Sequence, residues 1–132
     1  MLQTVGKPED IGPALESAKA GGAQAVNILA SPLLFAFRSQ IFAKATSLGL
    51  PTMYQWADGL TEGATIAYGP SSTETFRQWG RLVGKVLRGT NPRDLPVEQP
   101  TSFKLTINLK LARQLGVTIP PSMLQRADEV IE

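Results

Sequence analysis

The pattern of apolar and polar positions in the first half of the chain predicts helices that alternate with buried strands. Apolar residues recur at helical spacing over 10–20 and again over 33–48. Three short apolar runs between turn residues are typical of strands, and the first is nearly continuous, as in a strand buried on both faces. This order with short connections predicts an α/β fold with a parallel, right-handed, doubly wound sheet. The predicted strands are 25–30, 52–56 and 64–68.

The second half begins with a strongly amphipathic helix. Ser71 and Glu74 have the spacing of a capping box, with Ser71 at the N-cap. One face of the predicted helix carries an apolar stripe, which we expect to pack, and the opposite face carries a basic stripe. The apolar stripe is Phe76, Trp79, Val83, Val86 and Leu87, and the basic stripe is Arg77, Arg81, Lys85 and Arg88.

Three prolines over 90–100 predict an extended connector after this helix, because proline lacks a backbone donor. The alternating residues 103–108 then predict a half-buried strand. Helices are predicted over 109–115 and over 121–131.

Composition excludes much of enzyme chemistry. The 132 residues, with a net charge of +2, suit one ordinary globular domain, and no run is long enough to cross a membrane. The chain contains no histidine and no cysteine. A Ser-His-Asp triad, a cysteine nucleophile and a histidine or thiolate metal site are therefore excluded. We expect no catalysis, no cofactor and no metal, and the near-neutral charge gives no reason to expect nucleic acid.

Ligand groups are expected at the carboxyl ends of the first strands, where open α/β sheets place their crevice. A hydroxyl and a helix start are available after the first strand, and aromatic side chains after the next two. Each of these side chains has an alternative role in capping or packing. The candidate ligand-binding residues are Ser31, Pro32, Tyr54, Trp56 and Tyr68.

Two other groups of charged residues have weaker functional interpretations. Asp58 and Glu62 share one loop, where an acid/base pair could act on a sugar or an ester, but no partner residue converges on them in the sequence. Solvation of the loop is the favoured interpretation. The basic stripe could hold phosphates, although a solvated helix face explains it more simply.

Several ordered segments resemble the substrate-binding proteins of ABC transporters, specifically the tryptophan/tyrosine-type solute-binding family. The resemblance extends from about residue 23 to residue 132. At the looser match around 28–32, the family usually has an acidic residue where this chain has Ser31. The segments that carry the resemblance are 66–71, 95–101, 107–110, 115–121 and 127–131.

The resemblance implies a type I periplasmic binding fold, in which a solute binds in a cleft between two Rossmann-like lobes. Residues 1–69 would be the core of the second lobe. Residues 70–132 would supply the hinge-crossing helix, the proline-rich connector over 90–100, and the C-terminal strand and helices. These parts would complete a first lobe, and most of that lobe is not in this sequence. Half of the cleft would then be absent, so we expect weak solute binding or none.

The apolar stripe on the amphipathic helix would, by the same reasoning, have no sheet to pack against. Leaving such side chains and Phe103 in water would forfeit on the order of 10 kcal/mol. We therefore predict a homodimer or higher oligomer that pairs through the stripe.

The leading hypothesis is a solute-binding component of an ABC importer for a small organic solute such as an amino acid, with an ABC permease as its partner. The resemblance implies a periplasmic location, whereas the absence of a signal peptide implies the cytoplasm if Met1 is a true start. An alternative is a stand-alone oligomeric α/β sensor or scaffold whose basic stripe meets an acidic partner. An enzyme acting through Asp58 and Glu62 is the last alternative.

Overall fold

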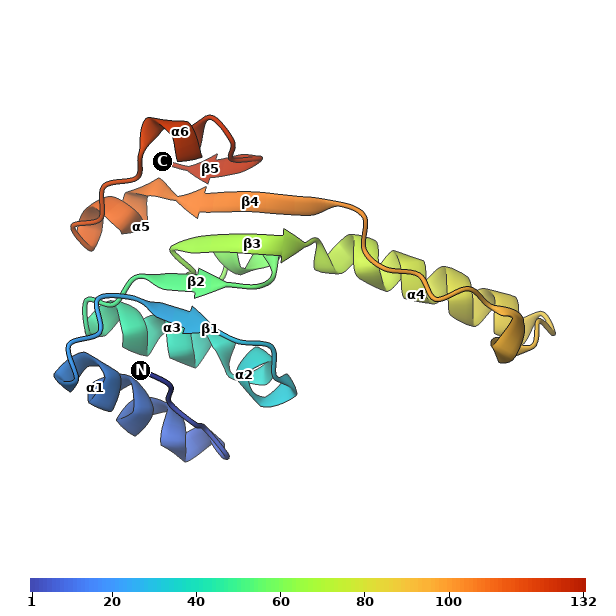
Figure 1. Ribbon diagram of the computed structural model, residues 1–132, viewed down its shortest axis with the longest axis horizontal. Helices are drawn as coiled ribbons and strands as arrows, with labels where there is room; N and C mark the ends of the chain where they lie inside the picture. The colour runs from blue at the N-terminus through green and yellow to red at the C-terminus, as the bar shows by residue number, and fades with distance from the viewer.

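One five-stranded sheet organises the chain in a computed structural model that describes residues 1–132 (Figure 1). The strands follow the spatial order β1-β2-β3-β4-β5, which is also their order in the sequence. β1, β2 and β3 are parallel, β4 runs antiparallel to β3, and β5 is parallel to β4. The strands are β1 (Val26–Ile28), β2 (Thr52–Tyr54), β3 (Ile66–Pro70), β4 (Phe103–Asn108) and β5 (Glu129–Ile131). The predicted α/β class and the parallel first three strands are confirmed.

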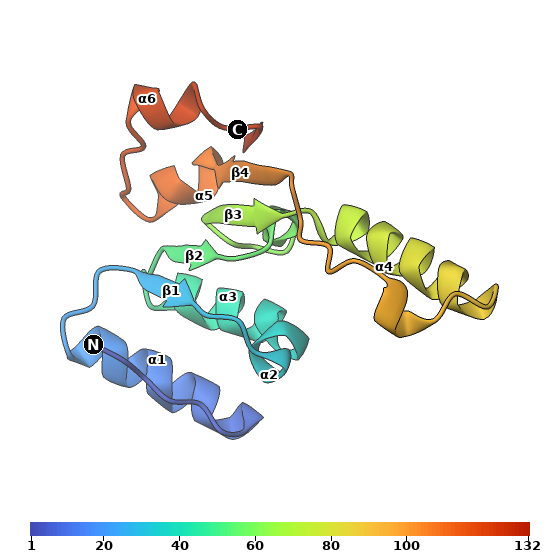
Figure 2. The same ribbon diagram turned by 45° about the vertical axis from the view of Figure 1, so that its right-hand side comes forward.

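The α-helices gather at the two ends of this strand order. α1, α2 and α3 lie beside β1 and β2, and α5 and α6 lie beside β4 and β5 (Figures 1 and 2). A short 3-10 helix, η2 (Ala57–Leu60), joins β2 to β3. The helices are α1 (Ile11–Ala20), α2 (Pro32–Ala36), α3 (Arg38–Ser47), α4 (Ser72–Leu87), α5 (Leu109–Gln114) and α6 (Pro121–Leu124).

Two separate clusters of buried side chains form the core. The larger joins α1, α3 and the first three strands through residues such as Ile11, Phe42 and Tyr54. The smaller joins β4 to α5 and includes Ile107 and Ala112, both 0 % exposed. Aliphatic residues at helical and strand spacing therefore pack where the sequence pattern predicts burial.

α4 leaves the body of the molecule at the end of β3 and projects beyond the sheet (Figures 1 and 2). The connector from α4 to β4 returns along the helix, and Gln78 Nε2 on α4 donates to a carboxylate oxygen of Glu98 on the connector at 2.8 Å. Among the large side chains of the apolar stripe, Phe76, Trp79 and Val83 are each more than half exposed. The stripe therefore has no sheet to pack against within this chain, and the predicted pairing of copies through it stays a prediction.

Four local expectations differ from the structure. The helix predicted over 33–48 is broken into α2 and α3 at Phe37, whose backbone leaves helical geometry at φ −106° and ψ 17°. The helix predicted over 121–131 ends at Leu124, and β5 follows because its backbone pairs with β4.

The other two differences concern α4 and β4. Ser71 makes no side-chain cap of α4. The strand over 103–108 joins the sheet of β1–β3, although the resemblance assigned it to a first lobe. The division of the chain at residue 69 stays a prediction.

Candidate functional site

A partly open cavity of about 350 Å³ lies where β1 and β2 end and α4 begins. This volume is within the range of sites that bind small molecules. Its position matches the general rule that open α/β sheets bind ligands beyond the carboxyl ends of their strands. The cavity is lined by Ala30, Ser31, Pro32, Phe35, Gln55, Trp56, Ser72, Thr75, Phe76 and Trp79.

Four aromatic side chains from three parts of the chain dominate this lining. Phe35 comes from α2, Trp56 from the end of β2, and Phe76 and Trp79 from the first turns of α4. Phe76 and Trp79 pack edge to face, with ring centroids 5.3 Å apart and planes at 89°. The spacing i, i+3 on one helix brings the two rings together. The cavity therefore offers aromatic faces and edges to a ligand.

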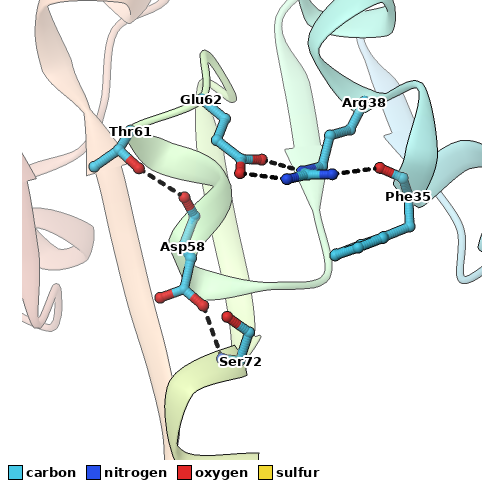
Figure 3. A network of polar contacts seen from close by, with 6 residues as sticks. All are labelled: Phe35, Arg38, Asp58, Thr61, Glu62 and Ser72. Carbon is cyan, nitrogen blue, oxygen red and sulfur yellow. Dashed lines mark hydrogen bonds and ion pairs between the residues drawn. The ribbon is translucent and has the colours of Figure 1, made fainter. Parts of the chain in front are cut away.

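An ion pair lies behind Phe35 and fixes the start of α3 (Figure 3). Arg38 donates from Nε and Nη2 to the two carboxylate oxygens of Glu62, and from Nη1 to the carbonyl oxygen of Phe35 at 2.7 Å. The guanidinium carbon of Arg38 also lies 4.3 Å from the centroid of the Phe35 ring. The hydrogen bond to Glu62 raises the pKa of Arg38. Arg38 thus holds the Phe35 backbone and the loop of Glu62 together.

Asp58 takes the capping role that the sequence assigned to Ser71. Its Oδ2 accepts the backbone N–H of Ser72 at 2.7 Å, at the first residue of α4 (Figure 3). A carboxylate at this place satisfies a backbone donor with no helical partner and opposes the positive end of the helix dipole. Thr106 Oγ1 in turn donates to the carbonyl oxygen of Ala57 at 3.0 Å, which ties η2 to β4. These contacts place α4 beside the strand ends.

Three of the five predicted ligand residues line the cavity and two do not. Ser31, Pro32 and Trp56 contribute to its wall. Tyr54 is 1 % exposed and packs edge to face on Phe42 in the core, so it is withdrawn from the candidate site. Alternate strand residues face opposite sides, and the Tyr54 position faces inward.

Tyr68 is 53 % exposed but lies outside the cavity. Its ring stacks on Phe103 of β4, with centroids 6.0 Å apart and planes at 29°. These residues occupy facing strands, since Tyr68 pairs with Leu105 and the neighbouring Pro70 pairs with Phe103. Tyr68 therefore contributes to the surface beside the projecting helix.

The sequence pattern missed most of the aromatic wall. Phe76 and Trp79 were assigned to the apolar stripe that pairs two copies of the chain, because an apolar stripe at helical spacing usually marks a packing face. Phe35 was counted as an ordinary helix residue, and Gln55 was placed at a strand end but not among the candidate ligand residues. The available signal was their position, since both lie within five residues of a predicted strand end.

Two larger cavities have linings that suit a ligand less well. One of about 620 Å³ lies between the N-terminal segment, α1 and β1, and it is walled by core residues such as Ile11, Leu15 and Ile28. This apolar gap lies beside the edge strand β1 and shares Ala30 and Ser31 with the candidate cavity. The other, of about 630 Å³, lies between the basic face of α4 and the connector, and no hydrophobic residue lines it.

Three solved structures share this fold at low sequence identity. They are the ABC domain in complex with L-Trp from Streptococcus pneumonia (TM-score 0.84, 23% identity), a conserved domain protein from Vibrio cholerae (0.86, 24%), and a ligand-free, open substrate binding protein with adhesive properties from Clostridium difficile (0.61, 16%). Each match covers 96% of this chain but only 42–44% of the other chain. The chain thus spans less than half the length of these relatives.

The sequence matches the family model for ABC transporter substrate binding proteins over residues 3–131. The chain therefore belongs to that family. No curated protein sequence matches it. No helix in the structure has the length and apolar character needed to cross a bilayer.

Proposed function

We propose that this chain contributes one wall of the solute site of an ABC importer, and that the solute is a small organic molecule such as an amino acid. Membership of the family supports the transport role, and the complex of a similar structure with L-Trp supports an amino acid as the first solute to test. The single observation that carries the proposal is the aromatic cavity at the carboxyl ends of β1 and β2.

The affinity of the isolated chain should be low. One wall makes only part of the contacts that a closed cleft makes, and a dissociation constant near 1 mM corresponds to only about 4 kcal/mol of binding free energy. In a complete binding protein, closure of a second lobe over the solute would raise the affinity. We propose that this complete form works outside the cytoplasm and delivers its solute to an ABC permease.

Binding without catalysis is supported by how the two loop carboxylates are held. Asp58 accepts the N–H of Ser72, and Glu62 is paired with Arg38. The two residues thus have different partners in different directions (Figure 3). An acid/base pair needs both carboxylates to face one substrate bond, so this arrangement disfavours the enzymatic alternative.

Self-association through α4 is the second part of the proposal. Phe76, Trp79, Val83, Val86 and Leu87 are between 38 % and 82 % exposed. Together they expose on the order of several hundred Å², which is the size of patch that marks an interaction surface on a soluble protein. Two copies packing these faces would approach the lower end of the area buried in specific interfaces. A second copy of this chain is therefore the proposed occupant. Because Phe76 and Trp79 also line the cavity, self-association and solute binding would compete for these two side chains.

Solute binding is tested by saturation-transfer NMR with a panel of amino acids. Trp79→Ala removes one aromatic wall from an exposed helix position, and Val86→Ala is the matched control on the same helix outside the cavity. Aromatic amino acids should receive saturation from the unmodified chain and from Val86→Ala, and several-fold less from Trp79→Ala. Equal transfer to all three proteins would place binding elsewhere and contradict the proposal.

A further inference from the structure

The arm that projects from the body, residues 71–102, carries all of the net charge of the chain. It consists of α4 and the connector, and its five basic and three acidic residues give +2, which is also the net charge of the whole chain. Four of these basic residues form the basic stripe. None of the four has an ion-pair partner, since the ion pairs in the structure are Arg38–Glu62 and Lys44–Glu16. The basic stripe is therefore a row of cations that the chain does not neutralise.

The polar cavity of about 630 Å³ lies between this basic face and the connector. The connector returns along the helix (Figures 1 and 2), so the cavity is a groove with a helical wall and an extended wall. Gln78 and Glu98 hold the two walls together through their side-chain hydrogen bond. Among the residues that line the groove, those with free polar groups are Arg77 and Arg81 on α4, and Gln99, Thr101 and Ser102 on the connector.

The extended wall has backbone groups that the chain leaves unpaired. Residues 96–102 belong to no helix or strand, and they make no backbone–backbone hydrogen bond. Pro96 and Pro100 have no N–H, but the other residues of this stretch offer both a donor and an acceptor. A second extended chain can pair with such groups, as peptides do when they add to the edge of a sheet.

We propose that this groove binds an extended acidic peptide segment of another protein, with its main chain against the connector and its carboxylates on Arg77 and Arg81. These two arginines are four residues apart, which is about 6 Å along the helix axis. Alternate residues of an extended chain lie about 6.6 Å apart on one side. Carboxylates at alternate positions therefore match the arginines, and each can accept a bidentate pair of hydrogen bonds. This interaction goes beyond solute binding and does not depend on it.

The form of the groove favours a peptide over other anions. Single-stranded nucleic acid stacks its bases on aromatic side chains beside the cations, whereas Phe76 and Trp79 lie on the opposite face of α4. An anionic bilayer is flat and would not reach into a groove. Pairing of two copies through the apolar stripe would leave the groove open, because the stripe and the basic face are on opposite sides of the helix.

Two carboxylates also line the groove and set where an acidic peptide lies. Glu74 is in the first turn of α4, and Glu98 is held beside the second turn by Gln78. The basic stripe continues beyond them to Arg88, at the end of the helix. The acidic residues of the peptide should therefore lie along the outer part of the groove, away from the sheet.

Three seven-residue peptides with capped ends separate the spacing of charges from charge alone. The first has four glutamates that alternate with serines, the second has the same glutamates in one run, and the third has lysines in place of glutamates. Dissociation constants are measured at pH 7 from ¹⁵N chemical shifts of the full chain, followed at the backbone amides of Arg77, Arg81, Gln99 and Thr101. At low salt the alternating peptide should bind at least about fivefold more tightly than the clustered peptide, and the lysine peptide should not bind. Its affinity should fall several-fold at about 200 mM salt, because the charges are exposed.

Two double variants of equal net charge assign the effect to the groove. Arg77→Gln with Arg81→Gln removes the guanidinium groups of the groove and keeps good helix formers. Arg113→Gln with Arg126→Gln is the matched control, because both residues are exposed and lie by α5 and α6, away from the arm (Figure 1). The first variant should weaken the alternating peptide at least about fivefold, and the control less than twofold.

The other outcomes would overturn the proposal. Equal affinity of the clustered and alternating peptides, or equal weakening in the two double variants, would reduce the interaction to attraction by net charge. Binding without shifts at Gln99 and Thr101 would exclude pairing with the connector. Tighter binding of an oligothymidylate of equal charge, or of vesicles containing phosphatidylglycerol, through the same arginines would assign this face to nucleic acid or to lipid.

Discussion

Gly69 on β3 lies against the backbone of Gln55 so closely that a Cβ on Gly69 would be 1.7 Å from the Gln55 carbonyl oxygen. This contact joins the end of β2, which lines the cavity, to the strand that leads into α4. No side chain can yield to make room, because the opposing atom belongs to the main chain. The strand ends must separate if Gly69 is replaced by any other residue.

Gly69→Ala should therefore lower the free energy of unfolding by at least about 2 kcal/mol, in the range of overpacked cores. The measurement is urea denaturation followed by circular dichroism. Gly80→Ala is the matched control, because a Cβ there meets nothing within 4 Å. In the middle of α4 it should raise stability by up to about 1 kcal/mol. Equal effects of the two changes would contradict the close approach at Gly69.

Replacement of Asp58 should loosen the start of α4. Asp58→Ala removes the acceptor for the Ser72 N–H and should cost about 1 kcal/mol, the usual value for a lost helix cap. Asp58→Asn keeps an oxygen acceptor and should lose less. Amide hydrogen exchange at Ser72 reports the effect directly. If its protection is unchanged in Asp58→Ala, Asp58 does not cap this helix.

Tyr54 gives a prediction for stability at alkaline pH. Burial raises the pKa of the Tyr54 hydroxyl above 10.0, with Arg38 lowering it and Glu62 raising it to a smaller extent. The folded chain therefore holds this proton at a pH where the unfolded chain releases it. The contribution of this proton to the free energy of unfolding is fully present below pH 10. It is lost as the pH rises through the pKa of Tyr54 in the folded chain.

Tyr54→Phe should remove that part of the alkaline loss, seen as a smaller fall in unfolding free energy between neutral and alkaline pH. At pH 7 it should be neutral or stabilising, since the buried hydroxyl has no hydrogen-bond partner in the protein. Tyr68→Phe is the control, because Tyr68 is 53 % exposed. Parallel curves for both variants and the unmodified chain would show that Tyr54 ionisation does not affect stability.

Self-association through α4 should be visible by light scattering at micromolar concentration. The unmodified chain is expected as a dimer or higher oligomer, and Val83→Lys with Leu87→Lys should shift it toward the monomer by placing charges in the stripe. Val97→Lys is the control, because Val97 is 95 % exposed on the connector. A stable monomer of the unmodified chain would overturn the prediction.

The fold was largely predictable because burial follows periodicity. Aliphatic residues at strand and helix spacing placed α1, β1–β3 and α4 within a few residues of their observed bounds. The tail was not predictable, because β5 forms only through pairing with β4, which lies more than twenty residues earlier. The same holds for the cap of α4, since Asp58 reaches Ser72 across fourteen residues of sequence.

The candidate site was predictable in position but not in detail. The rule for strand ends depends only on topology, and it selected Ser31, Pro32 and Trp56, which line the cavity. Their contact with a solute stays a prediction. The rule could not tell that Tyr54 faces inward, since one step along a strand reverses the direction of a side chain. Nor could it place α4 against the strand ends, because that position depends on tertiary contacts at Gly69 and Asp58.

Solute contact at this cavity is tested most directly by ¹⁵N chemical-shift mapping of the full chain during titration with L-tryptophan. The largest shifts should fall on the indole N–H signals of Trp56 and Trp79 and on the amides of Gln55 and Phe76, which line this cavity and not the apolar gap. Residues of the apolar gap beside the N-terminal segment, such as Leu15 and Ala18, should not move. Saturable shifts confined to that gap, or shifts absent from both indole signals at millimolar solute, would contradict a solute site at the strand ends.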